Sequence, residues 1–147
     1  MKLSTRSRYG TRAALELALH HGKGPLQTKI IAERQDISLK YLEQVMSSLK
    51  SGGFIRSFRG SKGGYILARE PNQIKLSEVF NALEGPIVTV ECLEDPDFCG
   101  QAEDCVTREV WSEVQKAMQT VLESITLQDL VDRAEQKRND KKVNYQI

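Results

Sequence analysis

The feature that most constrains the fold is a helix, a turn and a second helix, followed by a glycine-rich hairpin, all within residues 27–68. A short helix is predicted around 27–34, and the turn follows it. Ser38 suits the N-cap of a second helix over about 39–51, because its hydroxyl can accept a backbone N–H of the first turn. Residues at helical spacing predict one buried face of that helix, made by Leu39, Leu42, Val45, Met46 and Leu49.

Two β-prone runs follow at 54–58 and 65–68, and they flank a glycine-rich turn with cationic side chains. This pattern predicts a hairpin with a flexible, basic tip. The tip residues are Arg59, Gly60, Lys62, Gly63 and Gly64. Further helices are predicted over 5–21 and 76–84. The expected fold class is therefore mainly α with a small β wing, as a winged helix-turn-helix domain over residues 1–85.

The second half of the chain has a different pattern. Residues 86–105 form an acidic loop that contains all three cysteines. One long amphipathic helix follows from about 106 to 125, and its apolar stripe is too long for the N-terminal half to cover, so a partner helix is expected. Thr126 opens a last short helix, which completes a dimerisation segment over 106–136. Residues 137–147 are expected to form a frayed polar tail.

The net charge of +1 hides an uneven distribution. Residues 1–70 contain 13 Lys and Arg against 5 Asp and Glu, whereas residues 71–147 contain 8 against 15. A basic N-terminal half suits a polyanionic partner, although an ordinary solvated surface is the alternative. The chain has neither a long apolar run nor a signal-like N-terminus, so we expect a cytoplasmic protein with reduced thiols.

In a winged helix-turn-helix, the second helix of the pair enters the major groove of DNA. The side chains expected to point outward from helix 39–51 are Lys40, Tyr41, Glu43, Gln44, Ser47 and Ser48. Gln44 can bond to an adenine and Glu43 to a cytosine amino group, whereas Ser38 and Tyr41 suit phosphate or thymine-methyl contacts. Arg59 can enter a minor groove. Such segments also serve purely structural roles, so the pattern favours DNA binding without excluding that alternative.

Cys92, Cys99 and Cys105 are the only cysteines in the chain, and they fall as C-x6-C-x5-C. Thiolates grouped in one loop can converge on an iron–sulfur cluster or on zinc. The close cysteine pair typical of structural zinc is missing, so zinc is the weaker interpretation, and three inert surface thiols remain a further alternative. The neighbouring carboxylates predict raised thiol pKa values in the metal-free chain.

Several short motifs point to one family. They are Leu3-Ser4, Arg8-Tyr9-Gly10, Glu33-Arg34-Gln35, Ile37-Ser38-Leu39, Tyr41-Leu42-Glu43-Gln44, Arg59-Gly60 and Gly63-Gly64-Tyr65. On these residues the region 1–85 resembles the DNA-binding part of the IscR-type iron–sulfur regulators, a family of bacterial winged-helix repressors. The resemblance continues through the cysteine loop, Val110-Trp111 and Ile125-Thr126-Leu127.

The resemblance implies a DNA face lined by Ser38, Lys40, Tyr41, Glu43 and Gln44, with Arg59, Gly60 and Lys62 in the wing. It implies a homodimer built on the long helix, which binds a palindromic double-stranded promoter site. It also implies that the three cysteines bind an iron–sulfur cluster, with [2Fe–2S] favoured over [4Fe–4S]. The regulated genes would be those of iron–sulfur cluster biogenesis, and cluster-assembly proteins are possible partners.

The chain departs from the family at the fourth cluster ligand. The closest members have a histidine three residues after the third cysteine, where this chain has Arg108, which offers no lone pair. Related regulators use an N-terminal carboxylate where this chain has Arg8. Our hypothesis is that Glu43 of a second subunit supplies the ligand. The alternatives are a water-derived ligand or a loop acid, namely Glu94, Asp97 or Glu103.

Two other classes of function are alternatives to this one. The chain lacks a nucleophile–base spacing and a phosphate-binding glycine motif, so we do not expect an enzyme. A cluster-free winged-helix regulator is the main alternative, and it would respond to a partner protein, a metabolite or thiol oxidation.

Overall fold

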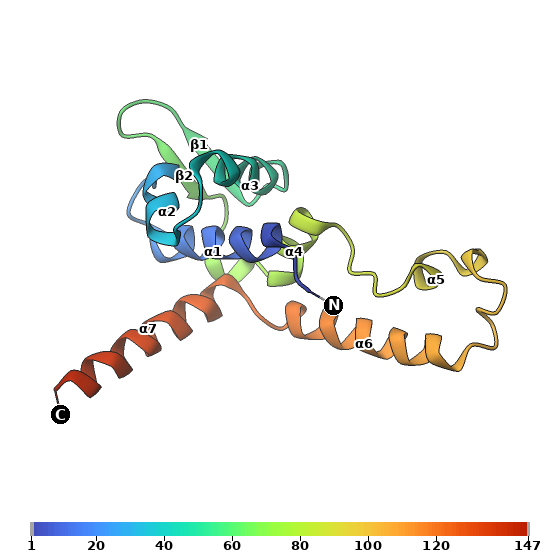
Figure 1. Cartoon of the computed structure of the whole chain (residues 1–147). Helices are drawn as coiled ribbons and strands as arrows, with labels where there is room; N and C mark the ends of the chain where they lie inside the picture. The colour runs from blue at the N-terminus through green and yellow to red at the C-terminus, as the bar shows by residue number, and fades with distance from the viewer. Residues whose placement is uncertain (1, 147) are drawn as a thin grey trace.

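The computed structural model describes residues 2–146 and is mainly helical with one two-stranded antiparallel sheet, as predicted. In chain order the elements are α1 (Thr5–Leu19), α2 (Thr28–Gln35), α3 (Leu39–Ser51), β1 (Ile55–Phe58), β2 (Gly64–Leu67), η1 (Pro71–Gln73), α4 (Leu76–Glu84), α5 (Glu91–Glu94), η2 (Pro96–Phe98), α6 (Val106–Glu123) and α7 (Leu127–Tyr145). Figure 1 shows α1 to α4 and the sheet gathered into one body, while the loop with α5 and most of α7 extend away from it.

Helix α3 has the predicted bounds because both of its ends are marked locally. The Ser38 hydroxyl accepts the backbone N–H of Tyr41 at 3.2 Å, and Gly52 follows the last turn. Four of the five side chains predicted to face inward are buried, namely Leu42, Val45, Met46 and Leu49. The prediction for Leu39 is wrong, because its side chain remains 43% exposed.

The wing is the antiparallel pair β1 and β2, with Ile55 opposite Leu67 and Phe58 opposite Gly64. Leu26 adds a short third connection, since its backbone exchanges two hydrogen bonds of 2.9 Å with Tyr65. Gly64 has φ +147°, and a Cβ there would lie 2.4 Å from the carbonyl oxygen of Leu26. Only glycine permits this close approach, which fixes the wing against the segment before α2.

One hydrophobic core contains side chains from the N-terminal helices and from the start of α7. Its largest fully buried side chains are Leu17, Ile31, Leu42, Met46, Leu49, Ile74 and Leu127. The backbone of Leu127 donates to Ile74 at 2.9 Å, and Leu76 donates to Ile125 at 2.8 Å. The start of α7 is therefore part of the N-terminal domain, because Leu127 and Val131 lie in its core.

The predicted short last helix is wrong, and so is the frayed tail as far as Tyr145, because α7 continues to that residue; residue 147 lies outside the described residues. A capping box between Thr126 and Asp129 starts the helix. Side-chain pairs four residues apart then support it, as where Gln136 donates to Asp140 at 3.2 Å. No helix within residues 2–146 is both long and apolar enough to cross a membrane.

Candidate DNA interface and cysteine loop

The exposed face of α3 carries Lys40, Glu43, Gln44 and Ser47, so the structure leaves these predicted outward side chains free to approach a partner. Tyr41 is different. Its ring is half-buried and meets the Tyr9 ring of α1 edge to face, with 5.9 Å between centroids. Tyr41 therefore helps to hold α3 on α1.

A polar network that was not predicted from the sequence holds α2 against α1. The buried Glu16 carboxylate of α1 accepts hydrogen bonds from Arg34 at 3.2 Å and from Gln35 at 2.5 Å. Arg12 in turn donates to the Gln35 side-chain oxygen at 2.6 Å. A carboxylate within the apolar stripe of residues 5–21 was the available signal, because a buried charge needs partners.

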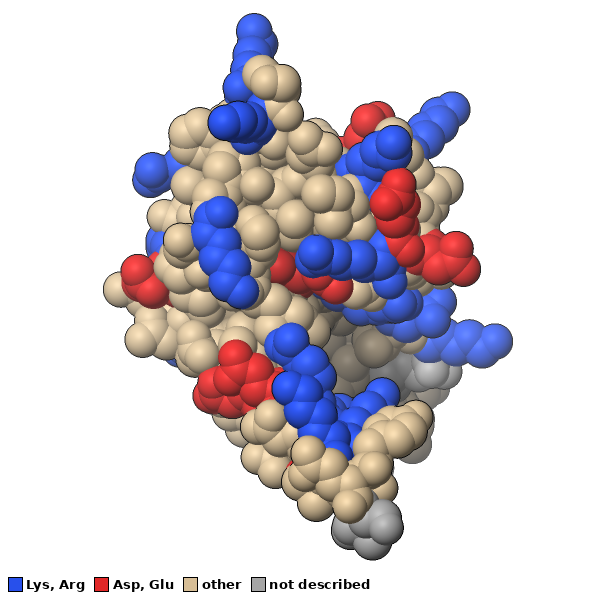
Figure 2. Space-filling model, turned by 90° about the vertical axis from the view of Figure 1, so that its left-hand side faces the viewer, with Lys and Arg blue, Asp and Glu red and all other residues tan. Residues whose placement is uncertain are grey.

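The wing tip is basic, as predicted. Arg59, Gly60 and Lys62 are all exposed, and the Gln27 side chain donates to the Ser61 carbonyl at 3.2 Å, which ties the tip to the start of α2. Figure 2 shows lysine and arginine side chains spread over one face of the molecule, including its upper end where the wing tip lies. Exposed cations on the wing, near a free helix face, form a surface suited to a polyanion.

The cysteine loop joins this domain to α6. Cys92 and Cys105 are half-buried, Cys99 is exposed, and all three are free thiols. Within residues 2–146, no three side chains of His, Cys, Asp or Glu are already placed to hold a metal ion. The structure thus puts the three cysteines in one accessible loop without assembling them into a finished site.

Arg108 closes the base of this loop. Its Nε and Nη2 atoms both donate to the carbonyl oxygen of Cys92, each at 3.2 Å. Cys92 lies on α5 and Arg108 in the first turn of α6, so this pair joins the two ends of the cysteine segment. Arg108, which stands at the position where the resemblance led us to expect a histidine ligand, thereby has a structural contact.

The expectation of raised thiol pKa values is wrong at Cys105. A contact with the Thr107 hydroxyl, 3.3 Å from the Cys105 sulfur, lowers the pKa of this thiol, and the backbone N–H of Arg108 lowers it further. Cys105 is the N-cap of α6, where backbone donors are unpaired, and these local donors outweigh the desolvation that would raise the pKa of the thiol.

Glu43 and the cysteine loop lie on separate parts of a single chain. Figure 1 shows α5 and its loop extending away from the domain that carries α3. Glu43 is exposed there, on the same face as Lys40 and Gln44. A Glu43 ligand therefore requires a second copy of the chain.

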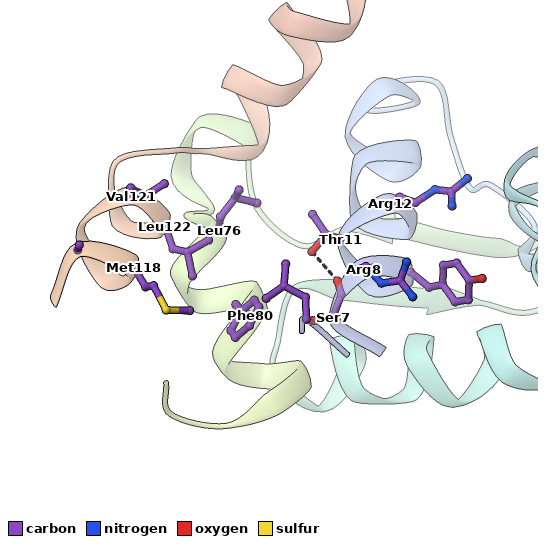
Figure 3. A pocket seen from close by; sticks show the side chains of 12 residues that line it. Ser7, Arg8, Thr11, Arg12, Leu76, Phe80, Met118, Val121 and Leu122 are labelled. Atoms are coloured by element: carbon purple, nitrogen blue, oxygen red, sulfur yellow. Dashed lines mark hydrogen bonds between the residues drawn. The ribbon is translucent and has the colours of Figure 1, made fainter. Parts of the chain in front are cut away.

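An apolar groove lies between α1, α4 and α6, with a volume of about 750 Å³. Phe80 and Leu76 of α4 face Met118, Val121 and Leu122 of α6 across it (Figure 3). Beyond the groove, the apolar stripe of α6 is uncovered: Val106 is 72% exposed and Trp111 is 44% exposed. As predicted, this single chain does not cover the stripe.

Comparisons with known proteins agree with this architecture. Residues 3–133 match the family described as Rrf2, iron-dependent transcriptional regulator. The chain is 44% identical over 130 residues to the HTH-type transcriptional regulator CymR of Bacillus subtilis (strain 168), which covers 88% of this chain and 89% of that protein. It is 36% identical over 135 residues to the HTH-type transcriptional regulator IscR of Xenorhabdus nematophila, covering 92% and 82%.

Solved structures give the same result. The structure of CymR, the global cysteine regulator of B. subtilis, superposes with a TM-score of 0.77 at 42% identity, covering 90% of this chain and 98% of that one. T. potens IscR also gives a TM-score of 0.77 at 42% identity, covering 93% and 90%. These relatives are regulators and not enzymes. With the helix-turn-helix and the wing in place, this chain belongs to the Rrf2 family of DNA-binding transcriptional regulators.

Proposed function

We propose that this regulator is a homodimeric repressor that senses an iron–sulfur cluster held by Cys92, Cys99 and Cys105. The observation that carries the proposal is the placement of all three cysteines of the chain in one accessible loop, between the DNA-binding domain and α6. A regulator that responds only to a partner protein or a metabolite has little need for three grouped thiols. The regulated genes would be those of iron–sulfur cluster biogenesis, with cluster-assembly proteins as further partners.

The donor set fits an iron–sulfur cluster. Cysteine thiolates are the usual protein ligands of such clusters, and the three thiols here are free and reachable by solvent, which leaves one ligand to be supplied from elsewhere. Short turns rather than one rigid helix connect them, so the loop can bring the sulfurs together. When bound, the cluster would supply an iron- and oxidant-dependent occupancy, and we favour [2Fe–2S] over [4Fe–4S].

Arg108 couples the position of the cysteine loop to the position of α6. The arginine fixes the Cys92 end of the loop to the first turn of α6, and α6 packs on α4, which packs on α1 and α3. A change in the loop would therefore shift α6 relative to the domain that carries the recognition helix. Two such arrangements, favoured by different occupancies, suffice for regulation.

For DNA, we propose that the exposed Lys40, Glu43 and Gln44 face the major groove while Ser38 and Tyr41 contact the phosphates beside it. Arg59, Gly60 and Lys62 would place the wing against the neighbouring backbone or minor groove. The exposure of Lys40, Glu43 and Gln44 on α3, and of the wing-tip residues, supports this assignment.

The uncovered α6 stripe and the adjoining groove support a homodimer. An apolar helix face of this length is stable in water only when another surface covers it, and a second α6 has the matching pattern. A two-fold dimer presents two α3 helices to DNA. We therefore expect a palindromic site with half-sites about one helical turn or somewhat more apart.

We further propose Glu43 of the partner subunit as the fourth ligand, because Arg108 and Arg8 cannot coordinate iron. A Glu43 carboxylate bound to iron is unavailable to a base, so occupancy would alter recognition directly. The test is the Glu43→Ala variant, in which both the cluster spectrum and DNA affinity should change. Gln44→Ala is the control and should change DNA affinity alone. An unchanged Mössbauer spectrum in Glu43→Ala would exclude this ligand and leave the loop acids or water.

The main test is anaerobic purification with iron and sulfide analysis, followed by gel shifts of the loaded and metal-free protein. We expect a coloured protein that loses its colour in Cys92→Ser and keeps it in Gln101→Ser, a control in the same loop. Operator affinity should differ between the two forms by about 5- to 150-fold, the usual range of allosteric coupling. A colourless, iron-free wild type with unaltered affinity after reconstitution would contradict cluster sensing and leave DNA binding intact.

The alternative is a cluster-free regulator, which the similarity to the cysteine regulator CymR favours. In that case the thiols would act by oxidation, or a partner protein or metabolite would be the signal. Peroxide treatment that changes operator affinity of an iron-free protein, and that Cys105→Ser abolishes, would support this second function.

A further inference from the structure

One large apolar side chain on the DNA-facing side of the molecule has no role in the account above. Leu39 is the first residue of α3 and is 43% exposed, whereas Leu42, Val45 and Met46 of the same helix are almost fully buried. Its neighbours along the chain, Ser38 and Lys40, are polar and exposed. Leu39 is therefore an isolated apolar group at the start of a polar face.

The packing of α3 explains why Leu39 is left outside. Tyr41, two residues on, fills the side of the helix that faces α1 through its edge contact with the Tyr9 ring. Leu42 and Met46 fill the side that faces the core. Because Leu39 lies in the first turn, there is no preceding turn of α3 to cover it.

The position of Leu39 relative to Glu43 places it beside the proposed base-reading residues. At about 100° per residue, residues four apart lie only about 40° from each other around the helix axis. Leu39 and Glu43 are therefore neighbours on one strip of α3, with Leu39 nearer the N-terminal end. In helix-turn-helix proteins the N-terminal residues of this helix contact base edges.

The major groove offers one kind of apolar group at its base edges, which is the C5 methyl of thymine. We propose that Leu39 is a specificity-determining residue that packs on a thymine methyl group in each half-site. A leucine side chain offers no hydrogen bond, so a methyl is the base-edge group with which it gains most. In the metal-free dimer, a second subunit seated on α6 would leave Leu39 free, because α6 and α3 lie on opposite sides of the domain (Figure 1).

This inference rests on the proposed DNA binding by α3 and is tested on the metal-free protein, so it does not require a cluster. The test begins with selection of a tight-binding duplex from a random pool with the purified full-length protein. Each thymine of the selected duplex is then replaced by uracil, which removes only the C5 methyl. We expect one symmetry-related thymine per half-site to be sensitive, with affinity about fourfold weaker per methyl lost, since one buried carbon contributes about that factor.

The decisive measurement combines this replacement with Leu39→Ala. The variant should bind the thymine duplex more weakly than wild type and should no longer distinguish thymine from uracil at that position. Lys40→Ala is the matched control: it should weaken binding on both duplexes equally and keep the sensitivity to the methyl. Thermal unfolding of both variants should match wild type, because both side chains are exposed.

Two results would overturn the inference. One is a selected duplex in which no thymine is sensitive to uracil, and the other is a Leu39→Ala variant that retains the full wild-type sensitivity. Failure to select any duplex would instead contradict DNA recognition by the chain, and a colourless protein would contradict only cluster sensing. The three failures are therefore distinguishable.

Discussion

The DNA-binding domain and the segment that follows it are built in different ways. The domain has a core of fully buried side chains from α1 to α4, completed by Leu127 of α7. Helix α6 buries none of its residues within the described chain, and Ala102 is the one buried residue of the cysteine loop. The first region is stabilised by its own packing, whereas the second is placed to depend on something outside the single chain.

The largest expected effect compares one apolar truncation in each region. Leu49→Ala removes a fully buried side chain of α3 from the core, and it should lower the free energy of unfolding by about 2–5 kcal/mol. Val110→Ala, on the uncovered face of α6, should cost well under 1 kcal/mol in the monomer. Urea unfolding at a concentration that favours monomer measures both, and equal losses would show that α6 is already packed within its own chain.

The second prediction concerns association. Trp111→Asp places a charge on the apolar stripe of α6, where a partner helix would have to bury it. We expect the dimer dissociation constant to rise by about 100-fold or more in analytical ultracentrifugation. Glu113→Gln, on the same helix but outside the stripe, is the control, and a Trp111→Asp protein that stays dimeric would place the interface elsewhere.

Much of the first region could be predicted from sequence because its signals are local. Ser38 and Gly52 mark the ends of α3, and the glycines mark the wing, so both elements appear where expected. The exchange of roles between Leu39 and Tyr41 could not be predicted. Both lie at the edge of the apolar stripe, and which of the two is covered depends on where Tyr9 of α1 lies.

The second region was harder to predict because its determinants are not periodic. The length of α7 was underestimated, since a polar helix gives no apolar repeat and its support comes from pairs such as Gln136 with Asp140. The contact from Arg108 to Cys92 joins residues 16 positions apart, and no spacing rule connects them. The cysteine spacing predicted a shared role but could not place the sulfurs.

The third prediction tests whether Arg108 orders the cysteine loop. Arg108→Gln removes the paired donors to the Cys92 carbonyl, so amides of the loop should exchange with solvent faster by about fivefold, equivalent to roughly 1 kcal/mol of local stability. Amides of α3 should be unaffected. Hydrogen exchange read by mass spectrometry measures both regions at once, with Lys116→Gln on α6 as the control. If loop amides exchange no faster in Arg108→Gln, the arginine does not order the loop, and its proposed role in coupling the loop to α6 is contradicted.

The smallest expected effect concerns the join between the two regions at Asp129. The backbone N–H of Thr126 donates to the Asp129 carboxylate at 2.8 Å and, together with the Thr126 hydroxyl, lowers the pKa of Asp129. A lowered folded-state pKa means that the stabilisation is present above the unfolded-state value, near 3.9, and is lost as the pH falls through the folded-state value. Asp129→Asn should therefore reduce the urea midpoint slightly at pH 7, and the difference from wild type should shrink towards pH 3. Asp132→Asn, a change of the same kind outside the capping box, should show no such trend. A difference that stays constant with pH would mean that the capping hydrogen bond does not depend on the carboxylate charge, and that α7 is held to the domain by Leu127 and Val131 alone.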